Sequence, residues 1–538
     1  MDPLTIFQPA KELALEQPRL AFLGLAFVLF LSLVLRNAVP RGPLKKLPPG
    51  PRGLPVLGNV RELIGDKWLT FTALKEKYGD LMYLNAAGQH VVVLNTLQAV
   101  GDLLDRKAAV SSSRPRSIVV GIMTGNLMLP FLNPGEIWHR MRRASQDGLR
   151  SSVVPLFQPA LYREALTLTV HMVSDTRVDR STEWYGHIQR AVAASTIKMI
   201  YGKTAVHSDT DPDVRTLNIY LERLTRSATP GAYLVEIFPF LQWFPAWISP
   251  WKRMAAAAFA IDSTTFKRLF DETKEAEKKG IERPSVVKTL TERSKALGLQ
   301  EEEEFWLAGA VFTGAQTMTG VLSWWLMAMI LYPDVQKRMH DELDRVVGRD
   351  RLPTFEDCEN MPYMQAMVRE IVRWRPIDPL GLPHTTSEDI WHNGLFIPKG
   401  TMLVPNVWAI NRDPGTFGED AHHFNPARHL DKDGKLGPAP ADTKEEGHVS
   451  FGFGRRVCPG RFFANKMLLI NMVLLAWATK FDGERDSAGN LVGLDVDGCI
   501  DEGIVVRPVP FACNLIPRFS KATSMLQDQL SELSAQDY

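Results

Sequence analysis

The stretch from Glu301 to Tyr332 reads as one long helix, which Pro333 would end. At 1.5 Å per residue this helix would be about 48 Å long. Its middle, FWLAGAVFTGAQTMTGVLSWWLMAMI, is apolar around almost its whole circumference, so it should be buried. A buried helix of this length crosses a large domain. Helical periodicity also dominates most of the remaining sequence, so we expect a mainly α fold with small β-sheets.

Four polar side chains interrupt the apolar middle of this helix. Buried polar groups need hydrogen-bond partners, which makes these positions candidates for a functional site. The alternative is that the threonines bond back to carbonyls of their own helix. The four residues are Thr313, Gln316, Thr317 and Thr319.

The rest of the body shows no repeat, no low-complexity block and no long flexible linker. Asp80 to Asn95, DLMYLNAAGQHVVVLN, predicts two strands joined by an Ala-Gly turn.

The chain has 538 residues and a net charge of +1, and nothing in it suggests the concentrated basic face of a nucleic-acid-binding protein. We expect one folded body over residues 60–520 and a polar, peripheral tail over residues 521–538.

An apolar run near the start of the chain predicts a membrane anchor. Leu20 to Leu35 reads LAFLGLAFVLFLSLVL, close to the shortest length that spans a bilayer. Arginines and lysines gather after this run, and the positive side of a span stays cytoplasmic. We therefore expect residues 1–19 in the lumen, an anchor over residues 20–36, a proline-rich hinge over residues 37–59 and a cytosolic body. A cleaved signal peptide is the alternative, which the early acids and the RNAVPRGPLKK after the run disfavour.

A second apolar stretch, VEIFPFLQWFPAWISPW from Val235 to Trp251, is broken by three prolines and cannot be one continuous helix. Its tryptophans suit a membrane–water interface, where an amphipathic ring is stable. They suit a proline-rich turn packed on the body equally well. The tryptophans are Trp243, Trp247 and Trp251.

The chain has four cysteines, widely spaced and without a CxxC pair. This usage argues against a disulfide framework and against a structural zinc site. Cys458 differs from the others because it lies in a glycine-rich run, FGFGRRVCPG, from Phe451 to Gly460. The other three are best interpreted as small buried core residues.

Cys458 can serve as the single thiolate ligand of a haem, because the porphyrin supplies four other donors. A thiolate needs positive, hydrogen-bonding surroundings. We expect Arg455 and Arg456 to supply the charge and Phe451 to cover the sulfur. A helix should begin directly after the run, with its positive end toward the sulfur. The glycines that would permit a tight backbone beside a flat macrocycle are Gly452, Gly454 and Gly460.

The run resembles the haem-binding signature of the cytochrome P-450 superfamily, Phe-x-x-Gly-x-Arg-x-Cys-x-Gly, and matches it at every fixed position. Three more segments resemble that family, in the family's order. WHRMR resembles its Trp-x-x-x-Arg helix, REIVRWRP its Glu-x-x-Arg helix, and FNPAR the segment whose arginine completes an ion cluster. The resemblance covers essentially the whole chain, and the anchor and hinge resemble the microsomal type. The matched residues are Phe451, Gly454, Arg456, Cys458, Gly460, Trp138, Arg142, Glu370, Arg373 and Arg428.

The resemblance implies a cytochrome P-450 fold that holds haem b, with Cys458 as the axial thiolate of the iron. In that family one atom of O2 enters a substrate C–H bond and the other leaves as water, with the consumption of two electrons. Glu370, Arg373 and Arg428 would form a buried structural ion cluster near the thiolate loop. The residues that would bind the haem propionates are Trp138, Arg142, His384 and Arg456.

The chain departs from the family on the long helix. The family pattern Ala/Gly-Gly-x-Asp/Glu-Thr-Thr stands here as TGAQTM, so Gly314 and Thr317 match, but Gln316 replaces the acid and Met318 the second threonine. An amide can order a water but cannot donate a titrating proton at neutral pH. We expect Gly314, Gln316 and Thr317 to act together with water, unless the protons arrive by another route. The departure also leaves open a rearrangement or dehydration in place of oxygen insertion.

The microsomal resemblance implies that electrons come from NADPH through a membrane-bound flavoprotein reductase. It also implies a single-pass protein of the endoplasmic reticulum membrane with its catalytic domain in the cytosol. A basic face near the thiolate loop would steer an acidic partner, although any one of its residues could instead belong to an ordinary solvated surface. The residues of this predicted docking face are Arg140, Arg143, Arg455 and Lys466.

The residues that the resemblance places over the haem are mostly apolar, which suits a lipophilic small molecule. SSRPRSIVVG followed by FPAWISPWKRMA resembles fungal members that serve secondary metabolism, so a terpenoid or similar natural product is the leading expectation. The alternatives are oxidation of a xenobiotic or a fatty acid, and a haem protein without turnover. The predicted substrate contacts are Ile118, Val119, Met123, Phe312, Ala315, Leu380, Leu382 and Ile504.

Overall fold

The computed structural model describes residues 46–535 except residues 56, 175–182, 204–210, 230 and 504. The predicted lumenal segment, the predicted anchor and the first part of the predicted hinge lie outside the described residues. Ile504, one of the predicted substrate contacts, lies outside them too.

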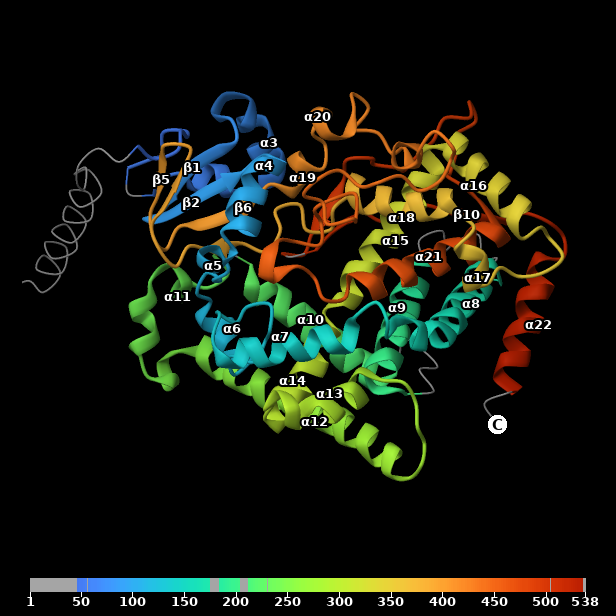
Figure 1. Ribbon diagram of the computed structural model, residues 1–538, viewed down its shortest axis with the longest axis horizontal. Helices are drawn as coiled ribbons and strands as arrows, with labels where there is room; N and C mark the ends of the chain where they lie inside the picture. The colour runs from blue at the N-terminus through green and yellow to red at the C-terminus, as the bar shows by residue number, and fades with distance from the viewer. Residues whose placement is uncertain are drawn as a thin grey trace, which may run out of the picture.

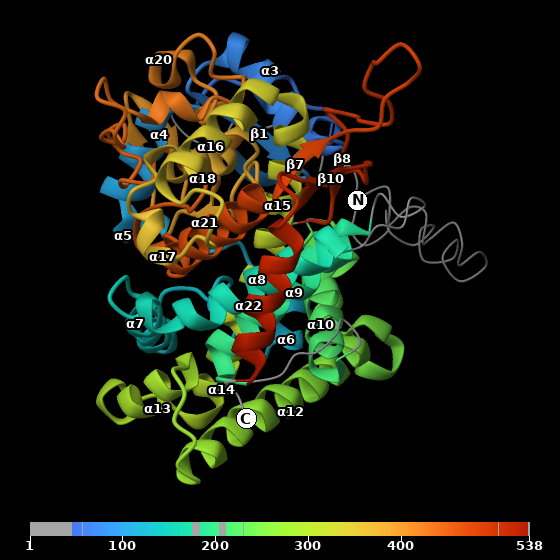
Figure 2. The same cartoon turned by 90° about the vertical axis from the view of Figure 1, so that its right-hand side faces the viewer.

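Most of the described chain is helical, as the sequence predicts (Figures 1 and 2). The helices of the first half are α3 (Lys67–Tyr78), α4 (Leu97–Val100), α5 (Ala108–Ser111), α6 (Ile118–Met123), α7 (Glu136–Leu149), α8 (Gln158–Ser174), α9 (Trp184–Tyr201), α10 (Pro212–Ala228), α11 (Leu234–Ile237) and α12 (Pro250–Lys278). Those of the second half are α13 (Val286–Leu297), α14 (Glu301–Val311), α15 (Gly314–Leu331), α16 (Pro333–Val346), α17 (Phe355–Cys358), α18 (Pro362–Trp374), α19 (Val407–Ile410), α20 (Pro414–Phe417), α21 (Arg461–Ala478) and α22 (Ala522–Ala535).

Within the described residues the strands form one mixed sheet and three two-stranded pairs. The predicted hairpin is confirmed, because β1 and β2 pair antiparallel around Ala87 and Gly88, both of which have positive φ. The sheet lies at one end of the body, beside α3 and α19 (Figure 1). Its strand order is β1 (Leu81–Ala86), β2 (Gln89–Leu94), β6 (Met402–Pro405) and β3 (His384–Thr385). The pairs are β4 (Ile390–His392) with β5 (Leu395–Ile397), β7 (Thr479–Asp482) with β10 (Asn514–Pro517), and β8 (Cys499–Asp501) with β9 (Val506–Pro508).

The predicted long helix is present as two helices in succession, α14 and α15. They are separated at Phe312 and Thr313, whose N–H groups donate to carbonyls three residues back rather than four. The apolar half beyond this break is buried, with Trp325 at 0% exposure. The helix therefore crosses the centre of the body as predicted, and its break falls beside the polar positions.

The polar positions of this helix divide into two kinds. The hydroxyls of Thr313, Thr317 and Thr319 donate to carbonyls of the same helix, as the simpler alternative proposed. Gln316 reaches outside the helix to a side chain of another segment. The helix therefore has one polar side chain in this set with a long-range partner, and that residue stands where the family has an acid.

Helix α21 is apolar enough by length and composition to cross a membrane, but 78% of it is buried inside the body. It therefore serves as a core helix that packs against α8, α15 and α18. The predicted polar tail forms α22, which lies along α8 and buries Leu526 (Figure 2). The Arg163 guanidinium of α8 donates to the Leu533 carbonyl at 3.1 Å and ties α22 down.

Candidate active site

Cys458 lies in a loop that leads directly into α21. The residue is half-buried, and its N–H donates to the Phe451 carbonyl at 2.8 Å. The loop needs glycine at 454, where φ is +53° and a Cβ atom would lie 2.2 Å from the Leu104 carbonyl oxygen. Helix α21 begins at Arg461, so the predicted helix start directly after the run is confirmed.

Burial and the neighbouring donor groups shift the pKa of the Cys458 thiol in opposite directions. Burial raises the pKa of the thiol, whereas the Gly460 N–H and the guanidiniums of Arg142 and Arg461 lower it, and the net shift is upward. A metal cation at the sulfur would displace the proton, because only the thiolate is a good ligand.

The prediction that Arg455 and Arg456 supply the positive charge is wrong. Arg455 is exposed to solvent. Arg456 donates to the carbonyls of Ser112 at 2.8 Å and Leu132 at 2.6 Å, because these loop carbonyls need donors inside the protein. Its guanidinium lies 4.5 Å from the centre of the Trp138 ring, so it holds that ring in place.

Arg142 is the arginine of this region that is best placed to bind a carboxylate. It is buried on α7, and one of its terminal nitrogens donates to the Val457 carbonyl beside the cysteine. Its Nε is buried and has no partner among the residues that the structure describes. A buried, unused guanidinium donor is costly unless a further acceptor binds there.

Arg114, which the sequence reasoning missed, lies beside the same cluster. Its guanidinium donates to the carbonyls of Leu382 at 2.6 Å and Pro383 at 2.7 Å, and burial lowers its pKa to about 10. His384 Nδ1 donates to the Ser111 carbonyl at 2.7 Å, and burial and Arg114 hold the pKa of His384 well below its ordinary value. The Nε2 atom of the neutral ring is an acceptor, so His384 can donate to a carboxylate only when it is protonated.

These residues fit a haem. The Cys458 sulfur at the start of a helix would supply one thiolate ligand, and the unused Arg142 donor beside it suits a propionate. In that complex Cys458 would ligate the iron, while Arg142, Arg456 and Trp138 would line the propionates. The bound haem would supply the activation of O2.

The predicted ion cluster is present and larger than expected. Glu370 and Arg373 are both 0% exposed, and two guanidinium nitrogens of Arg373 donate to the carboxylate at 2.7 Å. Arg428 Nε donates at 3.0 Å and His429 Nε2 at 2.9 Å. Burial alone would raise the pKa of Glu370, but Arg373 and His429 outweigh it and hold the pKa at about 2. His429 could not be found from the resemblance, which named only the two arginines.

The cluster also supports the cysteine loop. Ser450, which directly precedes the loop, donates from its hydroxyl to the Val372 carbonyl of α18 at 2.8 Å. Asn411 accepts from the Val449 N–H, and the Asn411 carbonyl accepts from Arg373. Rigid attachment of the loop to α18 therefore depends on the buried arginine.

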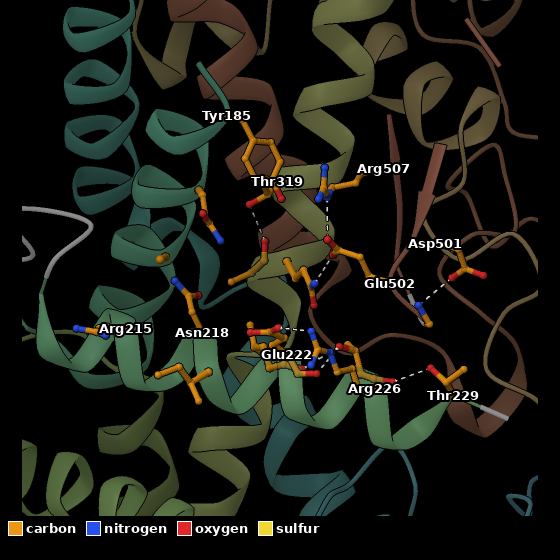
Figure 3. Close-up of a pocket in the computed structure, with 18 residues that line it drawn as sticks. Tyr185, Arg215, Asn218, Glu222, Arg226, Thr229, Thr319, Asp501, Glu502 and Arg507 are labelled. Atoms are coloured by element: carbon orange, nitrogen blue, oxygen red, sulfur yellow. Dashed lines mark hydrogen bonds and ion pairs between the residues drawn. The ribbon is translucent and has the colours of Figure 1, made fainter. Parts of the chain in front are cut away.

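The three predicted residues of α15 do not converge on one point. Thr317 Oγ1 donates to the Gly314 carbonyl at 2.7 Å. Gln316 Nε2 donates to Glu502 Oε2 at 2.6 Å, in a pocket of about 680 Å³ between α9, α10, α15 and the β8–β9 turn (Figure 3). The amide and the hydroxyl thus have separate partners, and Glu502 joins the site although sequence reasoning missed it.

The predicted substrate contacts are divided among different environments. Val119, Met123 and Phe312 are 0% exposed and pack in the main core, because positions i and i+4 of α6 face α10 and α12. Ala315 lines the polar pocket instead of an apolar one. A second pocket of about 570 Å³ lies between the α6 loop and α7. Neither pocket is lined by Ile118, Val119, Met123, Phe312, Leu380 or Leu382.

The predicted docking face is only partly free. Arg140 pairs with Glu303 of α14 at 2.6 Å, and Lys466 pairs with Glu359 at 2.7 Å. Arg143 and Arg455 are exposed. The basic surface available to a partner is therefore smaller than the sequence suggested.

Comparison with known proteins places the chain in a family. The family profile described as cytochrome P-450 matches residues 48–481. A cytochrome P-450 monooxygenase of Armillaria gallica is 49% identical over 91% of this chain and 93% of its own length. Cytochrome P-450 monooxygenase 58 of Postia placenta is 40% identical over 93% of this chain and 94% of its own length. Cytochrome P-450 monooxygenase iboC of Amanita muscaria is 36% identical over 95% of this chain and 98% of its own length.

These matches agree with the geometry of the Cys458 loop and the Glu370 cluster, and they extend over both. Membership of the family implies a haem-thiolate iron, O2, a redox partner and a small-molecule substrate. The chain belongs to the cytochrome P-450 family and is a monooxygenase of fungal type.

Proposed function

We propose that this enzyme inserts one oxygen atom from O2 into a lipophilic natural product, with a terpenoid as the leading candidate, in fungal secondary metabolism. The observation that carries the proposal is the placement of Cys458 at the start of α21, beside the unused donor of Arg142. In this arrangement Cys458 would hold the iron, and the Glu370 cluster fixes the loop that presents the sulfur.

The second pocket supports a lipophilic substrate. It adjoins Trp138, and the side chains of α6 that face it include Val120. Its lining mixes apolar side chains with polar ones, among them Arg116, Asn126 and Glu136, which would orient a lipophilic scaffold that carries polar groups. The apolar side chains that line it are Val120, Met128, Phe131, Leu132 and Ile137.

The proposed electron donor is an NADPH-dependent flavoprotein reductase. Arg143 and Arg455 are the exposed guanidiniums of the predicted docking face and would meet an acidic partner. Charge reversal at Arg143 should raise the reductase concentration that gives half-maximal rate. An unchanged concentration would remove Arg143 from the interface.

A location at the endoplasmic reticulum membrane is also proposed. The segment from α11 to the start of α12 exposes a group of large apolar side chains, and Trp243 and Trp247 are 80% and 77% exposed. A lipid interface would cover such a group. Glu236 within it accepts from the Ile118 and Val119 N–H groups at 3.0 and 2.9 Å, so the segment is tied to α6 beside the second pocket. The exposed apolar residues are Leu234, Ile237, Phe238, Phe240, Trp243, Phe244, Trp247 and Ile248.

Lipid contact can be measured with the full-length protein in vesicles that contain brominated lipid. The double variant Trp243→Ser/Trp247→Ser should lose most of the quenching of tryptophan fluorescence. Trp391→Ser is the matched control, because Trp391 is 54% exposed on β4. Equal loss of quenching in both variants would contradict the proposed surface.

The reaction is tested by coexpression with a fungal reductase. The protein is incubated separately with three compounds, namely farnesol, a sesquiterpene hydrocarbon, and dodecanoic acid, and the products are analysed by mass spectrometry. The proposal expects a gain of one oxygen in a terpenoid compound. A product formed only from dodecanoic acid would favour the fatty-acid alternative. A changed product without added oxygen would favour rearrangement or dehydration.

A further inference from the structure

Gln316 faces a pocket that many polar and charged side chains line. The pocket of about 680 Å³ lies between α9, α10, α15 and the β8–β9 turn, and Figure 3 shows polar side chains directed into it from all of these segments. A cavity of this size with this many hydrogen-bonding side chains has room for ordered water, because each water there would find several partners. The pocket lies on the side of α15 that carries Gln316.

The orientation of the Gln316 amide is fixed by a carboxylate. Its Nε2 donates to Glu502 Oε2 at 2.6 Å, so that carboxyl oxygen is the acceptor. Arg507 Nε donates to the other oxygen, Glu502 Oε1, at 2.8 Å. The remaining amide atom, Gln316 Oε1, is buried and accepts no hydrogen bond from the residues that the structure describes. That oxygen is an acceptor to which a water can donate.

The turn that carries Glu502 is held against α10 and α15. The Glu502 N–H donates to the Val505 carbonyl at 2.9 Å and closes the turn. Gly503 has φ of +101°, and a Cβ atom there would lie 2.2 Å from Thr229 Oγ1 at the end of α10. Only glycine satisfies both conditions. The local chain thus presents the carboxylate at position 502 to the helix.

We propose that Glu502 supplies the ionisable carboxyl that α15 lacks at position 316, and that the polar pocket is the route by which protons reach the helix. The inference rests on the proposed oxygen insertion, in which RH, O2, two protons and two electrons give ROH and H2O. The reductase supplies the electrons. Glu502 gives a proton to a water held by Gln316 Oε1 and takes another from the pocket water, so the carboxyl is regenerated. Glu502 is a positioning residue, since it acts through Gln316 and water.

The charged groups around Glu502 come from α10 and from the β8–β9 segment, and α9 contributes the titratable Tyr185. Arg507 of β9 pairs with Glu502 at 2.8 Å. The Arg507 guanidinium in turn lies 4.9 Å from the centre of the Tyr185 ring of α9. The titratable and charged residues that line the pocket are Tyr185, Arg215, Glu222, Arg226, Asp501 and Arg507.

The test exchanges the acid and the amide. Glu502→Gln keeps the shape of the side chain but holds no titrating proton. The double variant Gln316→Glu/Glu502→Gln restores one carboxyl and one amide in reversed positions. Asp501→Asn is the matched control, because Asp501 lines the same pocket and pairs with Lys67 at 3.7 Å rather than with Gln316. All variants are haem-loaded full-length protein with saturating reductase and farnesol as the probe.

With O2 consumption measured in H2O and D2O, Glu502→Gln should slow the reaction at least about tenfold and enlarge the solvent isotope effect, given the usual weight of a positioned proton donor. The exchanged pair should return to within about threefold of wild type, and Asp501→Asn should stay within about twofold. A wild-type rate in Glu502→Gln would overturn the inference. So would an exchanged pair that stays slow, because that result would mean that position 502 serves structure alone.

A second readout needs no turnover. The infrared difference between resting wild type and Glu502→Gln should contain a carboxyl band that shifts in D2O and grows as the pH falls. The absence of such a band would overturn the inference even where the rates agree with it. The proposed function would instead be contradicted if wild type consumed no O2 with farnesol, the sesquiterpene hydrocarbon or dodecanoic acid, although its infrared band changed with pH.

Discussion

Glu370 and Glu502 are both glutamates paired with arginine. The Glu370–Arg373 pair is fully buried and is called the closed pair, whereas the Glu502–Arg507 pair borders a pocket and is called the open pair. Glu370 and Arg373 are 0% exposed, and the carboxylate also accepts from Arg428 and His429. Glu502 and Arg507 are 25% and 18% exposed and border a pocket.

The same glutamate–arginine interaction can therefore serve either architecture or proton exchange, depending on its burial. A buried carboxylate whose donors are all fixed contributes to architecture, because a change of protonation would break the network. A carboxylate at the edge of a pocket, with an amide and one arginine as partners, can exchange its proton without unfolding its surroundings. The first pair holds the cysteine loop, and the second faces the helix where protons are consumed.

The largest effect is expected for Glu370→Gln. The amide cannot neutralise Arg373, and a buried guanidinium without its counter-charge costs about 3–5 kcal/mol. We expect little folded, haem-loaded protein and a greatly lowered thermal midpoint by circular dichroism. Asp341→Asn is the control, because Asp341 pairs with Lys337 at an exposed site, where a pair contributes about 0–1 kcal/mol. Similar midpoints for the two variants would remove the structural role of the closed pair.

Acid should weaken the closed pair in a defined pH window. A carboxyl whose pKa is lower in the folded state than in the unfolded state stabilises the fold above the unfolded pKa. This stabilisation is lost as the pH falls through the folded pKa. For Glu370 the window runs from about 4.5 down to about 2. The free energy of unfolding of wild type, measured by urea denaturation, should approach that of Glu370→Gln as the pH falls through this window. If the difference in free energy of unfolding between wild type and Glu370→Gln stayed constant over this window, the ionised Glu370 carboxylate would not be the source of the stabilisation.

The smallest effect on stability is expected for Glu502→Gln. The Glu502–Arg507 pair is partly exposed, so its loss should lower the free energy of unfolding by at most about 1 kcal/mol. Urea denaturation of the same preparations used for the O2 measurements checks this value. If Glu502→Gln were as unstable as Glu370→Gln, the contrast between the two pairs would disappear.

The sequence predicted the elements that depend on local pattern. The hairpin of β1 and β2, the start of α21 and the central helix follow from periodicity and turn residues. The pairing of Glu370 with Arg373 follows from helical spacing, and Arg428 from the family resemblance. These are short-range rules or matches to a known signature.

The missed parts of the site depend on contacts between distant segments. Glu502 meets Gln316 across 186 positions of the chain, and no spacing rule connects the two. Arg142 and Arg461 face the sulfur, although Arg456 is nearer in sequence than Arg142, because loop carbonyls bind Arg456. The family resemblance places the α6 residues at the substrate, and in this structure the side chains of Val119 and Met123 pack in the core.

The central claim, that Cys458 is the thiolate ligand of a haem, is tested most directly by adding carbon monoxide to the reduced, purified protein. The account predicts a main absorption band moved far to the red, its loss in Cys458→Ser, and its retention in Cys499→Ser, which alters another half-buried cysteine. A protein that binds no haem, or a red-shifted band that survives Cys458→Ser, would contradict the account.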